Sequence, residues 1–203
     1  IAAGNTVVIK PSELTPLSAL YLARLCAEIF PRGVVNILSG RGATLGAQLS
    51  AHPKVRMVSV TGDIATGQAV VRAAAGNLKR THLELGGKAP VLVFADADIP
   101  AAVRMMRTGG YYNAGQDCTA ACRVYVAESV REQFLEQLAA EVSTLHTGHP
   151  EDPASDFGPL ISRRQQERVQ GFVERAAALA HSEVLVGGKV PDGPGFFFQP
   201  TVI

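Results

Sequence analysis

The sequence has almost no excess charge of either sign, because 19 basic residues nearly balance 18 acidic ones and leave a net charge of +1. A protein that binds nucleic acid or an anionic membrane needs a clear basic surface, so we expect neither partner. Charged residues make up 18% of the chain and hydrophobic residues 47%, which is typical of a globular protein with a sizeable core.

Long apolar runs are also missing, since no stretch reaches the length of a transmembrane helix and no signal or transit peptide is recognisable. Cysteine is scarce, and the odd set of Cys26, Cys118 and Cys122 fits a reducing compartment better than a disulfide framework. We therefore expect a cytoplasmic protein. Because the chain begins with Ile1 instead of Met, we also expect a fragment of a longer polypeptide.

Motifs of several other site classes are absent. The chain has neither the Gly-x-Ser-x-Gly elbow of serine hydrolases nor a phosphate-binding Gly-Lys-Ser/Thr loop. His146 and His149 have no further metal ligands beside them, and Cys118 and Cys122 do not have Cys-x-x-Cys spacing. We expect no metal site.

Short apolar strands alternate with amphipathic helices in the first half of the chain. The expected strands cover 6–9, 34–38, 55–60 and 83–85, and the expected helices cover 16–30, 42–51 and 64–75. This alternation predicts an α/β fold with a parallel sheet and right-handed crossovers. Ligands of such sheets gather at the carboxyl ends of the strands.

The second half continues with a similar pattern. Strands are expected at 90–94, 123–126 and 184–186, and helices from about 98 and over 130–145 and 163–181. A connection rich in Pro, Gly and Asp joins the last two helices, and a Gly-Pro turn cluster covers 187–195. We expect a domain boundary at Gly86-Gly87, which divides 1–86 from 87–203.

Two segments at expected strand ends contain candidates for dinucleotide binding. Gly40-x-Gly42-x-x-x-Gly46 is one residue longer than the usual phosphate loop, and a tight turn without a ligand would explain the same glycines. Asp63 lies near the distance at which that motif expects a ribose-binding acid. It also follows Thr61-Gly62 at a helix start, where we prefer an N-cap.

Lys10 and Glu13 follow the end of the first expected strand and carry opposite charges. Both side chains suit the hydroxyl groups of a ribose. The alternative is a capping box in which Ser12 or Thr15 opens the following helix.

Glu84 and Cys118 are candidates for acid–base and nucleophilic chemistry. On a strand, His82 and Glu84 share one face, so Glu84 is either a solvated side chain or a general base. Cys118 follows a segment rich in Gly and small residues, where a thiol can be exposed enough to react. A buried, inert thiol is the alternative.

Four stretches together resemble the NAD(P)-dependent aldehyde dehydrogenases in order and spacing. They are Gly-Asn-Thr-Val-Val-Ile-Lys-Pro-Ser-Glu at 4–13, Val-Thr-Gly at 60–62, Leu-Glu-Leu-Gly-Gly-Lys at 83–88 and Asn-Ala-Gly-Gln-Asp-Cys at 113–118. The resemblance runs from residue 1 to 203 and includes Phe-Gly-Pro-Leu at 157–160. Within the family, 79–90 and 110–122 look most like the gamma-aminobutyraldehyde (4-aminobutanal, 1-pyrroline) dehydrogenases of polyamine and putrescine breakdown.

The resemblance implies that 1–86 are part of a Rossmann-like NAD-binding domain and that 87–203 are part of an α/β catalytic domain. It makes Cys118 the nucleophile that adds to the aldehyde carbon and Glu84 the base for thioester hydrolysis. It favours NAD over NADP, because Glu13 would repel a 2′-phosphate. The implied cofactor-binding residues are Lys10, Pro11, Ser12, Glu13, Gly42, Gly62, Asp63, Ile64, Ala65, Thr66 and Leu85.

Departures from the family pattern leave alternatives. The usual Ser after Thr-Gly is Asp63 here, and its charge should weaken cofactor binding unless the side chain turns away from the pyrophosphate. The upstream Asn of the oxyanion site and the downstream Glu-x-Phe segment are not in the sequence. Betaine-aldehyde or succinate-semialdehyde dehydrogenase, or an inactive fragment that acts only as a cofactor-binding remnant, are the alternatives. The parent enzyme is expected to be a homotetramer or homodimer that acts on a small aldehyde.

Overall fold

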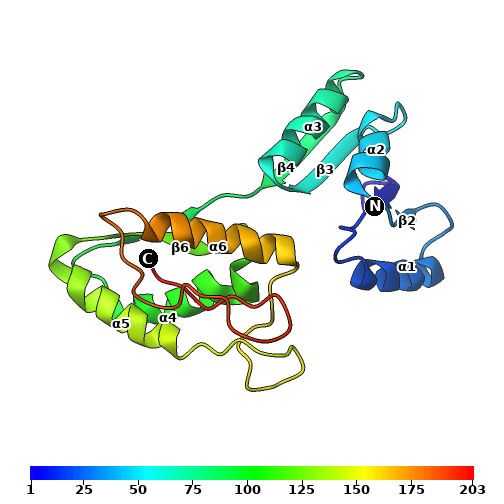
Figure 1. Cartoon of the computed structure of the whole chain (residues 1–203). Helices are drawn as coiled ribbons and strands as arrows, with labels where there is room; N and C mark the ends of the chain where they lie inside the picture. Colours follow the sequence, from blue (N-terminus) through cyan, green and yellow to red (C-terminus); the bar gives the residue numbers. More distant parts are fainter. The chain divides into compact units, whose positions relative to one another are not determined.

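Strands and helices alternate through most of the chain, as the hydrophobic pattern predicts, and the two last helices follow each other without a strand between them (Figure 1). The computed structural model describes residues 1–203 and divides into two compact units, Ile1–Gly86 and Gly87–Ile203. All three strand pairs are parallel, so the fold has the expected α/β class. The division falls at the Gly86-Gly87 pair, where the sequence predicts a boundary.

The first unit consists of two β–α–β segments. Its elements are β1 (Val7–Ile9), α1 (Leu17–Ile29), β2 (Val35–Ile37), the π-helical turn η1 (Gly42–Gly46), α2 (Ala47–Ala51), β3 (Met57–Gly62), α3 (Ile64–Ala75) and β4 (Arg80–Leu85). β1 pairs with β2, and β3 pairs with β4. The sequence predicts one sheet, but the structure has two separate pairs. β1 and β2 are three residues long and offer few backbone groups for further pairing.

The turn between β3 and α3 is tight, because only Asp63 separates the two elements. β3 ends at Gly62, two residues later than predicted, because Thr61 and Gly62 still pair with Glu84 and Leu85. A Cβ atom at Gly67 would lie 2.9 Å from the terminal methyl groups of Leu85, so a larger residue here would force the Leu85 side chain to shift. The helix is therefore packed directly against the end of β4.

The second unit also begins with a β–α–β segment. Its elements are β5 (Ala89–Val93), α4 (Ile99–Tyr111), the 3₁₀ turn η2 (Tyr112–Gly115), β6 (Ala121–Val126), the 3₁₀ turn η3 (Glu128–Val130), α5 (Arg131–Ser143) and α6 (Arg163–Ala177). The strand predicted at 184–186 is wrong. Only Val186 forms an isolated bridge, to Val202, because Gly187 and Gly188 follow with φ of 69° and 82° and leave the extended conformation.

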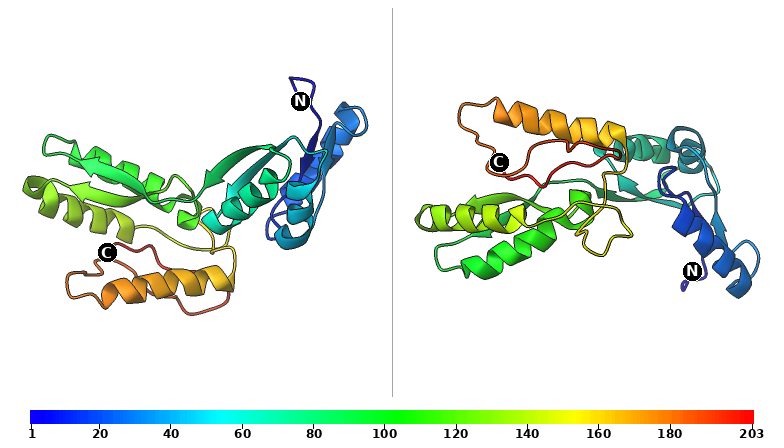
Figure 2. Two further views of the ribbon diagram at one scale, coloured as in Figure 1. Left: turned by 90° about the horizontal axis from the view of Figure 1, so that it is seen from above. Right: turned by 60° about the horizontal axis from the view of Figure 1, so that its bottom comes forward.

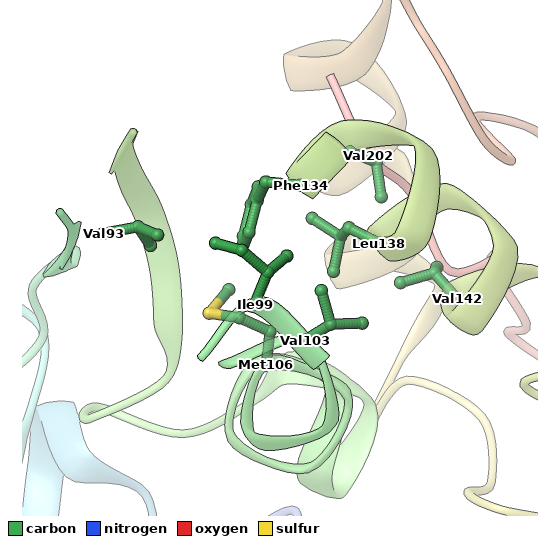
Figure 3. Close-up of a cluster of buried hydrophobic side chains, with 8 residues drawn as sticks. All are labelled: Val93, Ile99, Val103, Met106, Phe134, Leu138, Val142 and Val202. Carbon is green, nitrogen blue, oxygen red and sulfur yellow. The ribbon is translucent and has the colours of Figure 1, made fainter. Parts of the chain in front are cut away.

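The main core of the second unit consists of side chains from β5, α4 and α5, together with Val202 (Figure 3). Its buried side chains are Val93, Ile99, Val103, Met106, Phe134, Leu138, Val142 and Val202. Residues four apart on α5 supply three of them, which is the spacing of one helical face. Each such side chain contributes about 1.5–3 kcal/mol by leaving water.

A smaller core joins α6 to the last residues of the chain. Phe198 and Leu160 pack with Val173 of α6, and the amide of Gln166 donates to the Phe197 carbonyl at 2.7 Å. Both views in Figure 2 show the C-terminal segment beside α6. This segment thus contributes to both cores, because Val202 belongs to the larger one.

Candidate functional site

The carboxyl ends of β1 and β2 bring Lys10 and the glycine-rich turn together. The Lys10 ammonium donates to the Gly40 carbonyl at 3.3 Å and to the Pro11 carbonyl at 2.6 Å, and it lies 3.4 Å from the Glu13 carboxylate. β1 and β2 end side by side, with Ile9 opposite Ile37. The two segments singled out from the sequence are therefore neighbours.

The carboxylate of Glu13 is held in its charged form. Its own backbone N–H, the Lys10 ammonium and the backbone N–H of Gly42 all donate to it and hold the pKa of Glu13 below its usual range. Its side chain remains 48% exposed, so a ligand can reach it. An ammonium donor beside a carboxylate acceptor matches the two hydroxyl groups of a ribose.

Two glycines of the turn near this pair are uncrowded. A Cβ atom at Gly42 would meet no atom within 4 Å, and the nearest atoms to one at Gly46 are in the Lys10 side chain, at 3.8 and 3.9 Å. These residues fit the adenosine ribose of a dinucleotide. The capping-box alternative is wrong, because Ser12 accepts from Leu14 and α1 starts after Pro16 without a side-chain cap.

The turn between β3 and α3 is the second cofactor candidate. Asp63 is the N-cap of α3, and its carboxylate accepts a hydrogen bond from the Thr66 backbone N–H at 2.7 Å. The preference for a cap is therefore confirmed. Gly62 precedes this cap, and Ile64 and Ala65 follow it in the first turn of α3, where Ile64 is 60% exposed. A helix N-terminus attracts phosphate, but the Asp63 carboxylate already interacts with it.

Ile64 also lines a shallow, largely apolar depression of about 300 Å³ between α3 and β4. Leu83 and Leu85 form its strand side, and Gly67 and Val71 are on its helix side. Leu85 thus combines a packing contact with α3 and an open apolar surface. These contacts are structural, and the cofactor role of Ile64 and Leu85 remains a prediction.

Glu84 lies on the open face of the β3–β4 pair with two polar neighbours. The His82 Nε2 lies 3.2 Å from the Glu84 carboxylate, and the His82 Nδ1 lies 3.0 Å from the Ser59 hydroxyl. Ser59 is directly opposite His82 in the parallel register. The Glu84 side chain is 58% exposed, so a substrate water can approach it.

Cys118 is exposed, so the alternative of a buried, inert thiol is wrong. It follows three consecutive residues with positive φ, namely Asn113 (52°), Ala114 (57°) and Gly115 (72°). Side-chain-to-backbone hydrogen bonds between Asn113 and Gln116 run in both directions, at 3.0 and 3.2 Å. This left-handed turn reverses the chain after α4 and leads it to the cysteine.

The residue before the cysteine is a carboxylate. Hydrogen bonds from the backbone N–H and hydroxyl of Thr119, and one from the Cys118 thiol, hold the pKa of Asp117 below its usual range. Asp117 therefore carries its negative charge at neutral pH. It fixes the short turn from Asp117 to Ala120 that leads into β6.

A second cavity, of about 270 Å³, lies in the same unit as Cys118. Tyr111, Cys122, Leu160 and Phe198 are among its lining residues, and Cys118 is not. Cys122 is also exposed. The two thiols therefore face different surroundings although only three residues separate them.

The candidate residues are divided between the two units. Lys10, Glu13 and Gly42 come together at one sheet edge, and Asp63 and Glu84 belong to the same unit at β3–α3 and β4. Cys118 belongs to the other unit. Sequence reasoning placed His82 on the face of Glu84 but missed Ser59, which only the cross-strand register reveals.

The structure shows neither a cluster of metal ligands nor a membrane-spanning helix. No group of three or more His, Cys, Asp or Glu side chains is arranged to hold a metal ion. No helix combines the length and apolar character needed to cross a bilayer.

The chain is similar in sequence and in structure to known proteins. Betaine aldehyde dehydrogenase from Cereibacter sphaeroides is 42% identical over 203 residues, which is all of this chain and 42% of that protein. The crystal structure of PnpE from Pseudomonas sp. WBC-3 has a TM-score of 0.94 and 43% identity, covering 98% of this chain and 42% of its own.

A variant of betaine aldehyde dehydrogenase from Staphylococcus aureus, solved in complex with NAD+, has a TM-score of 0.93 and 38% identity. The match covers 98% of this chain and 41% of that one. The chain thus spans less than half of these relatives. The family model for the aldehyde dehydrogenase family matches residues 1–203, and the chain belongs to that family.

Proposed function

We propose that the protein containing this chain oxidises a small aldehyde to the carboxylic acid with NAD+, using Cys118 as nucleophile and Glu84 as general base. The observation that carries the proposal is the exposed Cys118 thiol after a left-handed turn, in a chain of the aldehyde dehydrogenase family. Small residues around a reactive group allow a substrate carbonyl to approach.

The covalent steps involve one sulfur and one carbon. The Cys118 thiolate adds to the aldehyde carbon, and the resulting oxyanion is a thiohemiacetal bound to the protein. Loss of hydride from that carbon leaves a thioester. Glu84 takes a proton from a water molecule, which attacks the thioester, releases the carboxylic acid and returns Cys118 as thiolate.

A bound NAD+ supplies the acceptor for the hydride that leaves the thiohemiacetal carbon. Lys10 and Glu13 would hold its adenosine ribose, with Pro11, Ser12 and Gly42 as neighbours. The turn from Gly62 to Thr66 would lie near the pyrophosphate. The charged Glu13 disfavours the 2′-phosphate of NADP, and a relative solved with NAD+ is consistent with this choice.

Activity assays on the full-length protein test the nucleophile. We expect Cys118→Ala to abolish NADH formation and to leave the NAD dissociation constant unchanged, because the thiol reacts with the aldehyde only. Cys122→Ala is the matched control, since this thiol is also exposed and lies four positions along the chain. NADH formation by Cys118→Ala at the parent rate would disprove the assignment.

The proposed substrate is 4-aminobutanal, supported by the resemblance of 79–90 and 110–122 to the aminobutyraldehyde enzymes. Betaine aldehyde is the second candidate, because two relatives that are 42% identical are named betaine aldehyde dehydrogenase. The kcat/KM values for 4-aminobutanal, betaine aldehyde and succinate semialdehyde decide between them. A value for betaine aldehyde above that for 4-aminobutanal would overturn our substrate proposal.

A further inference from the structure

Three side chains on the open face of β3–β4 lie in one row, Ser59–His82–Glu84, in which Ser59 is hydrogen-bonded to His82 and His82 contacts Glu84. The two links measure 3.0 Å between the Ser59 hydroxyl and His82 Nδ1 and 3.2 Å between His82 Nε2 and the Glu84 carboxylate. The imidazole therefore contacts a partner with each of its nitrogen atoms. Glu84 is the outermost member of the row.

We propose that His82, held by Ser59, is a positioning residue that aims the Glu84 carboxylate. The inference rests on the proposed role of Glu84 as general base. His82 would act only through Glu84 and would not touch the substrate.

The donor and acceptor groups of the row indicate which atoms carry its protons. A carboxylate is an acceptor only, so the proton between His82 and Glu84 belongs to Nε2 of the imidazole. In the tautomer that carries its proton on Nε2, Nδ1 accepts a hydrogen bond from the Ser59 hydroxyl. Glu84 Oε1 is thereby held by the ring, and its Oε2 is left to take a proton from water.

Strand geometry explains why such a support is useful. His82 and Glu84 are two residues apart on β4 and point to the same face, and Ser59 is in register across the pair. With 58% of its side chain exposed, Glu84 would otherwise sample several rotamers. A base must lie within hydrogen-bond reach of its water, so the loss of a fixed rotamer costs rate.

A purely stabilising role does not account for the row. The side chains of His82 and Glu84 are 53% and 58% exposed, and a contact between side chains this exposed stabilises a fold only weakly. Removal of His82 should therefore leave the fold intact. Its effect should fall on the step that needs the base.

Transient kinetics on the full-length enzyme test this inference. If thioester hydrolysis slows, one equivalent of NADH per active site forms rapidly and is followed by slow turnover. We expect His82→Leu to show this burst and to lower the steady-state rate about tenfold, with a smaller effect for Ser59→Ala. His82→Gln should recover most of the rate, because its amide nitrogen can donate where Nε2 does.

Two further variants separate the possible failures. Thr81→Val on the same strand is the control and should behave like the parent. If Glu84→Gln loses turnover while His82→Leu keeps the parent rate without a burst, the positioning role is wrong and the proposed function stands. If Glu84→Gln itself keeps the parent rate, the assignment of Glu84 as base is wrong, and the positioning role fails with it.

Discussion

The carboxylate of Asp63 accepts a hydrogen bond from the Thr66 backbone N–H at 2.7 Å, so the first turn of α3 already interacts with an anion. This is the turn at which the dinucleotide pyrophosphate is proposed to bind. A second negative charge at the same helix end would have to overcome repulsion from Asp63. The cap therefore stabilises α3, and its charge should oppose a pyrophosphate proposed to bind at this turn.

Replacing this carboxylate should tighten cofactor binding. For Asp63→Ser we expect a NAD dissociation constant about fivefold lower, which corresponds to ~1 kcal/mol. The serine hydroxyl can still cap the helix, so stability should hardly change. Isothermal titration calorimetry gives the constant. Asp98→Ser is the matched control, because Asp98 caps α4 with the same geometry. An unchanged or weaker affinity in Asp63→Ser would remove the repulsion argument.

The charge of Glu13 should set the choice between NAD and NADP. We expect Glu13→Gln to lower the ratio of the NADP to the NAD dissociation constant about tenfold, because the amide no longer repels the 2′-phosphate. Glu128→Gln serves as control. Glu128 also forms an i,i+3 ion pair at 3.4 Å, with Arg131, in the other unit. Equal ratios in Glu13→Gln and the parent would contradict the proposal.

Tyr111 should make the protein sensitive to alkali. Burial raises the pKa of Tyr111 to about 12, while its hydroxyl donates to the Thr201 carbonyl at 3.0 Å. The unfolded chain releases this proton from about pH 10, so folded-state stability is complete below pH 10 and falls as the pH rises toward 12.

For Tyr111→Phe we therefore expect a free energy of unfolding about 1 kcal/mol lower at neutral pH, from the lost hydrogen bond. We also expect a smaller decline above pH 10 than in the parent. Urea unfolding at several pH values measures both effects. Tyr112→Phe is the control, since this neighbouring ring is 68% exposed. An alkaline decline of parent size in Tyr111→Phe would show that another group is responsible.

The left-handed conformation of Ala114 should cost stability. Its φ of 57° is unfavourable for a residue with a Cβ, and glycine adopts it freely. We expect Ala114→Gly to raise the free energy of unfolding by about 0.5 kcal/mol after the loss of a methyl group against the smaller core. Ala140→Gly, on exposed α5 surface, should lower it by about 1 kcal/mol. A decrease in both variants would rule out strain at Ala114.

Local sequence signals predicted elements whose causes are themselves local. The helix from 64 to 75 has the predicted bounds because Asp63 supplies its cap and the apolar residues repeat along one face. Pairing across strands was not predictable in the same way. Thr61 and Gly62 looked like the end of a strand, and only their partners Glu84 and Leu85 keep them in β3.

The candidate site shows the same contrast. Lys10 and Glu13 were found because they follow the first strand with opposite charges, and Glu84 because strand alternation places it on the same face as His82. The contact between Ser59 and His82 depends on the register of two strands, which no local pattern encodes. Asn113 is a residue type that adopts the left-handed conformation readily, but Ala114 gives no signal of its positive φ in the sequence.

Val202 completes a core that begins with Val93, more than half the chain earlier. During synthesis, part of the apolar surface shared by β5, α4 and α5 stays exposed until Val202 has been made. The first unit has no such delay, because β1 pairs with β2 and β3 pairs with β4, so each pair is complete once its second strand has been made. During synthesis the second unit therefore exposes an unfinished core for longest, and this is where a chaperone would find its binding surface.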